Sequence, residues 1–189
     1  MNIGLYFGSF NPIHIGHLIV GNYVANHTDM QQVWYVVSPQ NPLKPSAGLL
    51  NEYHRLHLVR LAIEEEPKLK ASDVEFKLPR PSYTIDTLTY LREKYPQHQF
   101  SIIIGSDSFQ NLPKWKNFEL LVKDYAFIIY KRPGFEITET WNARVTILDA
   151  PMLDISATEI RNNIREGKSI RYLVEEKVRE EIEGNNYYK

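Results

Sequence analysis

Two histidines with a spacing suited to phosphate binding, His14 and His17, lie in the segment Gly8-Ser9-Phe10-Asn11-Pro12-Ile13-His14-Ile15-Gly16-His17-Leu18. The segment follows an apolar run, Asn2–Phe7, and leads into apolar residues at helical spacing. A helix N-terminus favours anions through its free N–H groups and its dipole. Because residues three apart share a helix face, both imidazoles could donate hydrogen bonds to phosphate oxygens.

The glycines of this segment also fit a ligand site. Gly8 permits a tight turn and leaves room for a ligand to approach the backbone. Gly16 lies between the two histidines and has no side chain to block that approach. We therefore expect the ligand to contact the turn as well as the imidazoles.

The histidine pair has two other interpretations. A metal site would need a third ligand, but none lies nearby and Asn11 is a poor one. A solvated helix face is the default for two histidines at this spacing, and it is the interpretation we give His54 and His57. The position of His14 and His17 after a strand, a glycine turn and a proline favours the phosphate site, with no protein-bound metal.

A second candidate phosphate site begins at Ser156. Ser156 suits a helix N-cap, with Glu159 three residues later as in a capping box. Thr158, Arg161 and the free N–H groups of that helix would face phosphate groups, and arginine binds phosphate oxygens in a bidentate fork. A role of Ser156 as a cap alone remains the alternative.

Two more charged residues follow predicted strands. Lys44 lies in the proline-rich loop 38–48, after the second strand, where a lysine could reach a ligand or could simply be solvated. Asp107 follows Gly105 at a strand end and is suited to accept hydrogen bonds from a ribose or an amide.

The elements that must position these residues alternate along the chain. The pattern predicts strands and helices in the following order: strand Asn2–Phe7, a helix from Ile15, strand Val33–Val37, helix Glu52–Glu65, strand Val74–Phe76, a helix from Ser82–Thr84 through Arg92, strands Phe100–Ile104, Tyr125–Tyr130 and Val145–Leu148, and helices Ala157–Arg165 and about Val174–Ile182. This alternation predicts an α/β fold, a doubly wound, Rossmann-like parallel sheet. Ligands of such sheets bind at the carboxyl ends of the strands, where the strand order reverses.

The chain is expected to form one domain over residues 1–189. A Rossmann-like core would cover about 1–150, and a small helical C-terminal subdomain would cover about 151–189. Its 189 residues are enough for a full hydrophobic core.

Composition excludes several classes of protein. The formal net charge of −1 argues against broad binding of nucleic acid or an anionic membrane. The absence of cysteine excludes disulfides, thiolate catalysis and Cys-ligated metal sites. No signal segment and no apolar run of membrane-spanning length is apparent, so a cytoplasmic location is expected. The oligomeric state, including a homo-oligomer, stays open.

Five motifs in order resemble one family over nearly the whole chain. The histidine segment resembles the His-x-Gly-His nucleotidyltransferase superfamily, and the full set resembles its bacterial nicotinate mononucleotide adenylyltransferases. The other motifs are Pro39–Lys44, Ser82–Leu88, Ile104–Asp107 with Leu112–Trp115, and Arg132–Gly134 with Ile155–Arg161.

The resemblance implies transfer of an adenylyl group from ATP to nicotinate mononucleotide, giving deamido-NAD and pyrophosphate in NAD biosynthesis. Mg²⁺ would arrive on ATP. The implied catalytic residues are His14, His17, Lys44 and Arg161. ATP would be bound by Gly8, Ser9, Phe10, His14, His17, Gly105, Asp107, Ser156, Thr158 and Arg161. The mononucleotide would be bound by Lys44, Thr84, Asp107 and Trp115, with the Trp115 indole stacked on the pyridine ring or, alternatively, only packed in the core.

The chain departs from the family pattern at four places. Phe7 stands where a second glycine is usual, Asn11 where aspartate is usual, Leu43 where histidine is frequent, and Ala157 where a second serine is frequent. These departures leave both histidines, Lys44, Ser156, Thr158 and Arg161 in place.

Other activities remain as alternatives. These are nicotinamide mononucleotide adenylyltransferase, pantetheine-phosphate adenylyltransferase, a cytidylyltransferase, a class I aminoacyl-tRNA synthetase fragment and a non-catalytic nucleotide sensor. A class I synthetase would also carry a Lys-Met-Ser-Lys-Ser motif, which this sequence lacks.

Overall fold

The computed structural model describes residues 1–40, 42 and 48–189. Its centre is one sheet of six parallel strands in the order β3-β2-β1-β4-β5-β6. The strands are β1 (Asn2–Gly8), β2 (Gln32–Val37), β3 (Leu69–Ser72), β4 (Gln99–Gly105), β5 (Ala126–Tyr130) and β6 (Arg144–Leu148). The predicted doubly wound, Rossmann-like α/β fold is confirmed by this order.

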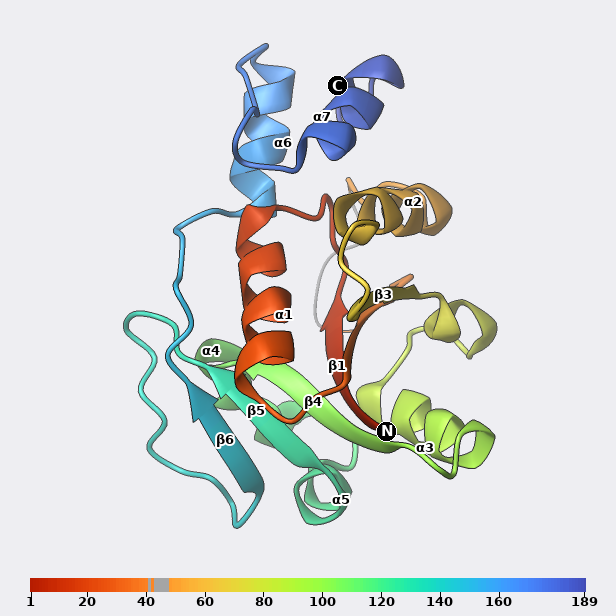
Figure 1. The fold of residues 1–189 in the computed structure, drawn as a ribbon, viewed down its shortest axis with the longest axis vertical. Coiled ribbons are helices and arrows are strands. Elements are labelled where there is room, and N and C mark those ends of the chain that lie inside the picture. Colours follow the sequence, from red (N-terminus) through yellow and green to blue (C-terminus); the bar gives the residue numbers. More distant parts are fainter. Residues whose placement is uncertain (41, 43–47) are drawn as a thin grey trace.

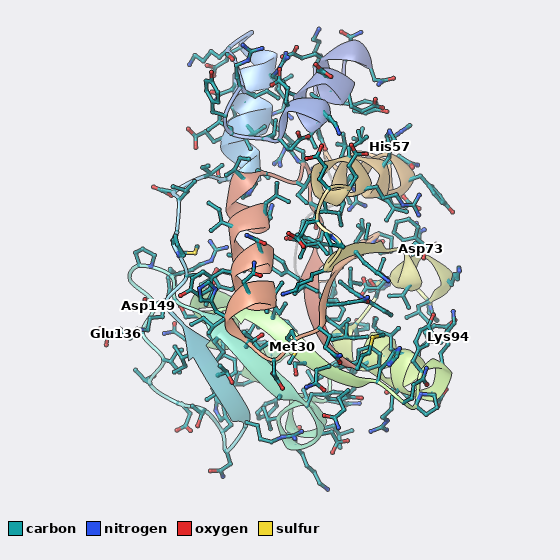
Figure 2. The ribbon with its side chains drawn as sticks, viewed as in Figure 1. Met30, His57, Asp73, Lys94, Glu136 and Asp149 are labelled. Carbon is teal, nitrogen blue, oxygen red and sulfur yellow. The ribbon has the colours of Figure 1, made fainter. Side chains whose placement is uncertain are left out.

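Helices cover both faces of the sheet, as Figure 1 shows. They are α1 (Ile15–His27), α2 (Glu52–Ile63), η1 (Val74–Lys77), α3 (Thr84–Lys94), α4 (Ser106–Phe109), η2 (Leu112–Lys114), α5 (Phe118–Asp124), α6 (Ala157–Arg165) and α7 (Glu176–Gly184). Alternate residues of each strand point to opposite faces of the sheet and contribute to two apolar clusters. Tyr35 and Val37 belong to the cluster that contains residues of α1, α2, α6 and α7, whereas Val36 belongs to the cluster that contains residues of α3 and α5. Side chains fill the space between these layers (Figure 2).

The predicted strand Val74–Phe76 is wrong. This segment forms η1, a 3-10 helix, and the third strand is the preceding Leu69–Ser72. β3 lies at the edge of the sheet and pairs only with β2, so it needs little apolar sequence to form. After it the backbone turns at Asp73, which places the carboxylate of Glu75 in the interior.

Three short helical segments between Gly105 and Tyr125 were not predicted: α4, η2 and α5. Each has seven residues or fewer, too short for apolar periodicity to stand out. The last helix, α7, begins at Glu176 rather than near Val174, because Glu175 caps it by accepting the Lys177 and Val178 N–H groups.

The strand order reverses between β1 and β4, which lie side by side at the centre of the sheet. The histidine loop leaves β1 at that point, and α6 and α7 lie beyond the carboxyl ends of the strands (Figure 1). In the part of the chain that the structure describes, every helix is too short or too polar to cross a membrane.

Candidate active site

The two histidines of the loop form a stacked pair. His14 is the N-cap of α1, in extended conformation, and His17 lies in the first turn of that helix. Their ring centroids are 3.6 Å apart and their planes differ by 29°. The backbone N–H of His14 donates to His17 Nδ1 at 3.3 Å. This bond assigns the hydrogen of the neutral His17 ring to Nε2, which makes Nε2 the donor.

His14 is buried and uncharged at neutral pH. Only 7% of the residue is exposed, and burial, with a smaller effect of the nearby Arg132 cation, lowers its pKa from 6.5 to about 4. Within the described residues, Nδ1 of His14 has no hydrogen-bond partner. A Cβ on Gly16 would lie 3.1 Å from this atom, so the missing side chain of Gly16 makes room for the His14 ring.

A cluster of aromatic side chains packs against the stacked histidine pair. The ring of Phe10 stands edge-on to His17 with centroids 5.1 Å apart, and Tyr6 and Tyr35 pack against Phe10. The Tyr35 hydroxyl donates to the His17 carbonyl at 3.1 Å. These contacts fix the start of α1 against the sheet.

The expected room for a ligand beside Gly8 is absent. A Cβ on Gly8 would lie 2.8 Å from the Phe10 ring, so the space that glycine leaves is filled by this buried side chain. Phe10 has a positive φ of 45°, which turns its ring inward beneath His17. Contact between a ligand and the turn is therefore left to the backbone of residues 8–10.

The first turn of α1 also offers fewer free N–H groups than expected. The N–H of Ile15 donates to the Leu173 carbonyl at 2.9 Å, and those of His17 and Leu18 donate to the His14 carbonyl. Among the described residues, only the N–H of Gly16 lacks a partner in that turn. At the start of α1, the groups left to bind an anion are therefore mainly the imidazoles.

The start of α6 keeps more of its donors. Ser156 is the N-cap as predicted, its Oγ accepting the Glu159 N–H at 3.1 Å. The N–H groups of Ala157 and Thr158 have no partner within the described part of the chain. Arg161 donates from Nη2 to Thr158 Oγ1 at 3.1 Å and from Nη1 to the Asn11 carbonyl at 2.7 Å.

This bond to Asn11 joins α6 to the histidine loop across 150 residues of sequence. Figure 1 shows the N-terminal ends of α1 and α6 facing the same region. Asn11 also uses both halves of its amide: Nδ2 donates to the Gly48 carbonyl at 3.0 Å and Oδ1 accepts the Leu50 N–H at 3.1 Å. An aspartate, the usual family residue, could make only the second of these bonds.

Sequence reasoning missed Arg55, a fully buried arginine on α2. Its guanidinium donates to the carbonyls of Ser9, Ser38, Pro39 and Leu50. It therefore ties the turn after β1 to both ends of the loop after β2. The sequence offered no signal for its burial, because exposed positions near the end of the same helix, such as Arg60, are also charged.

Asp107 forms an ion pair at the end of β4. Its Oδ1 lies 3.1 Å from Nε of Arg132, whose Nη2 donates to the Tyr130 hydroxyl at 3.3 Å. A Cβ on Gly105 would lie 2.5 Å from the Asp107 carboxylate. Glycine is thus required there for the pair to form. Both side chains are partly exposed and can meet a ligand.

Thr84 and Trp115 lie on the other face of the sheet. Thr84 begins α3, Trp115 directly follows η2, and both are half-buried. Lys116 pairs with Asp86 at 2.8 Å, which joins the segment of Trp115 to α3. The predicted site residue Lys44 lies outside the described residues.

A parallel sheet with this order, and a His-x-Gly-His loop at its central switch point, defines a nucleotidyltransferase of the Rossmann-like class. Residues 5–163 match the model of the cytidylyltransferase-like family, so the chain belongs to that family.

Within this family the chain belongs with the nicotinate-nucleotide adenylyltransferases. A Cytophaga hutchinsonii protein named "Probable nicotinate-nucleotide adenylyltransferase" is 52% identical over 100% of this chain and 98% of its own length. A Flavobacterium johnsoniae protein of the same name is 48% identical, with both chains fully covered. A solved structure of Plasmodium falciparum nicotinic acid mononucleotide adenylyltransferase complexed with NaAD superposes with a TM-score of 0.85 at 26% identity, covering 99% of this chain and 97% of that one.

Proposed function

We propose that this protein transfers the adenylyl group of ATP to nicotinate mononucleotide, giving deamido-NAD and pyrophosphate. The observation that carries the proposal is the bond from Arg161 to the Asn11 carbonyl, 2.7 Å long. It holds α6 against the histidine loop, which supports a single site in which both elements would bind phosphate. The names of the relatives support the same reaction.

The triphosphate would lie between the histidine loop and α6. His14 and His17 would contact its oxygens, with the backbone of Gly8, Ser9 and Phe10 beside them. Ser156, Thr158 and Arg161 would bind the remaining oxygens, since unpaired N–H groups and a guanidinium both favour phosphate. Gly105 and Asp107 would lie at the ribose of ATP.

The reaction is an in-line displacement at the α-phosphorus. A 5′-phosphate oxygen of the mononucleotide forms the new bond to phosphorus, and the bond to the bridging oxygen of pyrophosphate breaks. Because a phosphate monoester has its second pKa at about 6, the nucleophile is already dianionic near neutral pH and needs no general base. Catalysis therefore consists of positioning and charge neutralisation, with Nε2–H of His17 donating to the α-phosphate.

Mg²⁺ would enter with ATP. Among the described residues, no group of three or more histidine, aspartate and glutamate side chains is arranged to hold a cation. The triphosphate itself would supply the ligands that Mg²⁺ prefers, with water completing the shell.

The acceptor would lie across the edge of the sheet, at Thr84 and Trp115, with Lys44 at its phosphate and Asp107 at its ribose. A carboxylate only accepts hydrogen bonds, so a pocket that offers the Thr84 hydroxyl and backbone N–H groups near Trp115 suits nicotinate. An amide would turn its own N–H groups toward those donors. We therefore expect a preference for nicotinate over nicotinamide mononucleotide.

Pyrophosphate release tests the proposal directly. The protein is incubated with ATP and Mg²⁺ and with nicotinate mononucleotide, nicotinamide mononucleotide, phosphopantetheine or no acceptor. We expect the highest kcat/KM with nicotinate mononucleotide. Equal values for the two mononucleotides would contradict the acid preference alone, and no release with any acceptor would indicate a non-catalytic nucleotide sensor.

A further inference from the structure

Glu75 is a buried carboxylate that the proposed reaction does not use. It lies in η1 and is only 1% exposed. A buried carboxylate is costly unless it is paired or hydrogen-bonded, and burial raises the pKa of Glu75 above its ordinary value. Its retention in the interior therefore calls for a specific set of partners.

Those partners are hydroxyl groups at the start of α3. Ser82 Oγ donates to Oε2 of Glu75 at 2.6 Å, and Thr87 Oγ1 donates to Oε1 at 2.9 Å. A further hydrogen bond from the Ser38 side chain also favours the ionised form and opposes the effect of burial on the pKa. Each oxygen of the carboxylate thus accepts a hydrogen bond from a different hydroxyl.

The two hydroxyls flank the residue expected to contact the acceptor. Ser82 lies two positions before Thr84, and Thr87 lies three positions after it. Both Ser82 and Thr87 are buried, whereas Thr84 between them is half-buried. A single carboxylate therefore fixes the chain on either side of Thr84 and sets where its hydroxyl and the first N–H groups of α3 point.

We propose that Glu75 is a positioning residue for the mononucleotide site, acting through Ser82 and Thr87 on the start of α3. This inference rests on the proposed function. Glu75 does not touch either substrate. The histidine loop and α6 contribute to the apolar cluster on one face of the sheet, whereas Val74 of η1 and Ile85 of α3 belong to the cluster on the other face. Ser38 bonds to Glu75 through its side chain, while its bond to the Gly8 carbonyl comes from its backbone N–H, so this bond does not depend on Glu75. Replacement of Glu75 should therefore affect one substrate and spare the other.

The test is a split between the two KM values. Glu75→Gln keeps the shape of the side chain but replaces one acceptor oxygen with an NH₂ donor, so one hydroxyl must turn away. We expect the KM for nicotinate mononucleotide to rise about tenfold, because hydrogen bonds to a charged group are the stronger ones. The KM for ATP should stay within about twofold.

Thr87 provides an independent variant. Thr87→Val removes the hydroxyl and keeps the branched shape, and it should raise the mononucleotide KM in the same way. Thr87→Ser keeps the hydroxyl and should restore the parent value. Glu93→Gln is the matched control: Glu93 lies on the same helix as Thr87 but is exposed, and neither KM should change.

The outcomes separate this inference from the proposed function. Turnover of nicotinate mononucleotide by the parent, with both KM values raised equally in Glu75→Gln and Thr87→Val, would overturn the role of Glu75 alone. A lowered melting temperature with unchanged KM values would do the same. If the parent instead turns over another acceptor of the panel, the proposed function fails, and the same split is then measured with that acceptor. No turnover with any acceptor would overturn both.

Discussion

His14 contacts His17 in two ways: its imidazole stacks on the His17 ring, and its backbone N–H donates to His17 Nδ1. One residue thus fixes both the plane and the tautomer of the other. The hydrogen bond places the hydrogen of a neutral His17 ring on Nε2. The low pKa of His14, about 4, keeps the His14 ring itself neutral near pH 7. Because His14 is neutral, the stacked pair cannot form two adjacent cations before ATP arrives.

His17→Ala should lower kcat by about 10²–10³-fold, the usual cost of losing one donor to the transition state. The fold should persist, because Phe10 and Tyr35 still support the start of α1. His27→Ala, at the exposed C-terminal end of the same helix, is the control and should leave kcat unchanged. A His17→Ala protein within threefold of the parent would reduce His17 to a structural role.

Arg161→Ala should weaken ATP binding by about 1.5–3 kcal/mol, or about 10- to 150-fold in affinity, since it removes a charged hydrogen-bonding group. It also removes the bond between α6 and the histidine loop. Titration with ATP measures the effect directly. Arg165→Ala, one turn further along α6 and exposed, should bind ATP like the parent. A rise in the acceptor KM without any change for ATP would assign Arg161 to the other substrate.

The pH dependence of stability should report on His14. Its pKa is lower in the folded protein than the 6.5 of a free histidine, so the unfolded chain binds the proton more tightly. The contribution is complete above about pH 6.5 and is lost as the pH falls toward 4, by at most about 1.4 kcal/mol per pH unit.

Denaturant unfolding of the parent and of His14→Asn between pH 7.5 and 4.5 measures this effect. The slope should be steeper in the parent, while other titrating groups, including Glu75, are common to both proteins and cancel. Parallel curves would mean that His14 titrates normally.

Arg55→Met should lower the free energy of unfolding by about 3 kcal/mol or more, because several buried carbonyls lose their donor. For a chain of this size the melting temperature should fall by about 6–12 °C. Arg60 lies on the same helix but is exposed, so Arg60→Met should leave the melting temperature within about 2 °C of the parent. A similar value for both variants would show that water replaces the guanidinium.

The sequence by itself determined the order of the main elements and the chemistry of the loop after β1. Strands such as Phe100–Ile104 and helices such as Ala157–Arg165 can be predicted from the sequence, because side-chain periodicity follows directly from backbone geometry. The histidine spacing and the Ser156 cap are equally local. Short or edge elements, such as α4 and β3, carried too few apolar residues to be placed correctly.

Only the tertiary structure decided which residues meet. The Phe10 ring fills the space beside Gly8. The N–H of Ile15 donates to the carbonyl of Leu173, which lies 158 residues away in the chain. Arg55 and Glu75 look like surface charges in the sequence, yet both are buried. Their cost is offset by partners contributed from distant segments. Such partners are set by how the sheet brings loops together at one edge, and no local pattern encodes that.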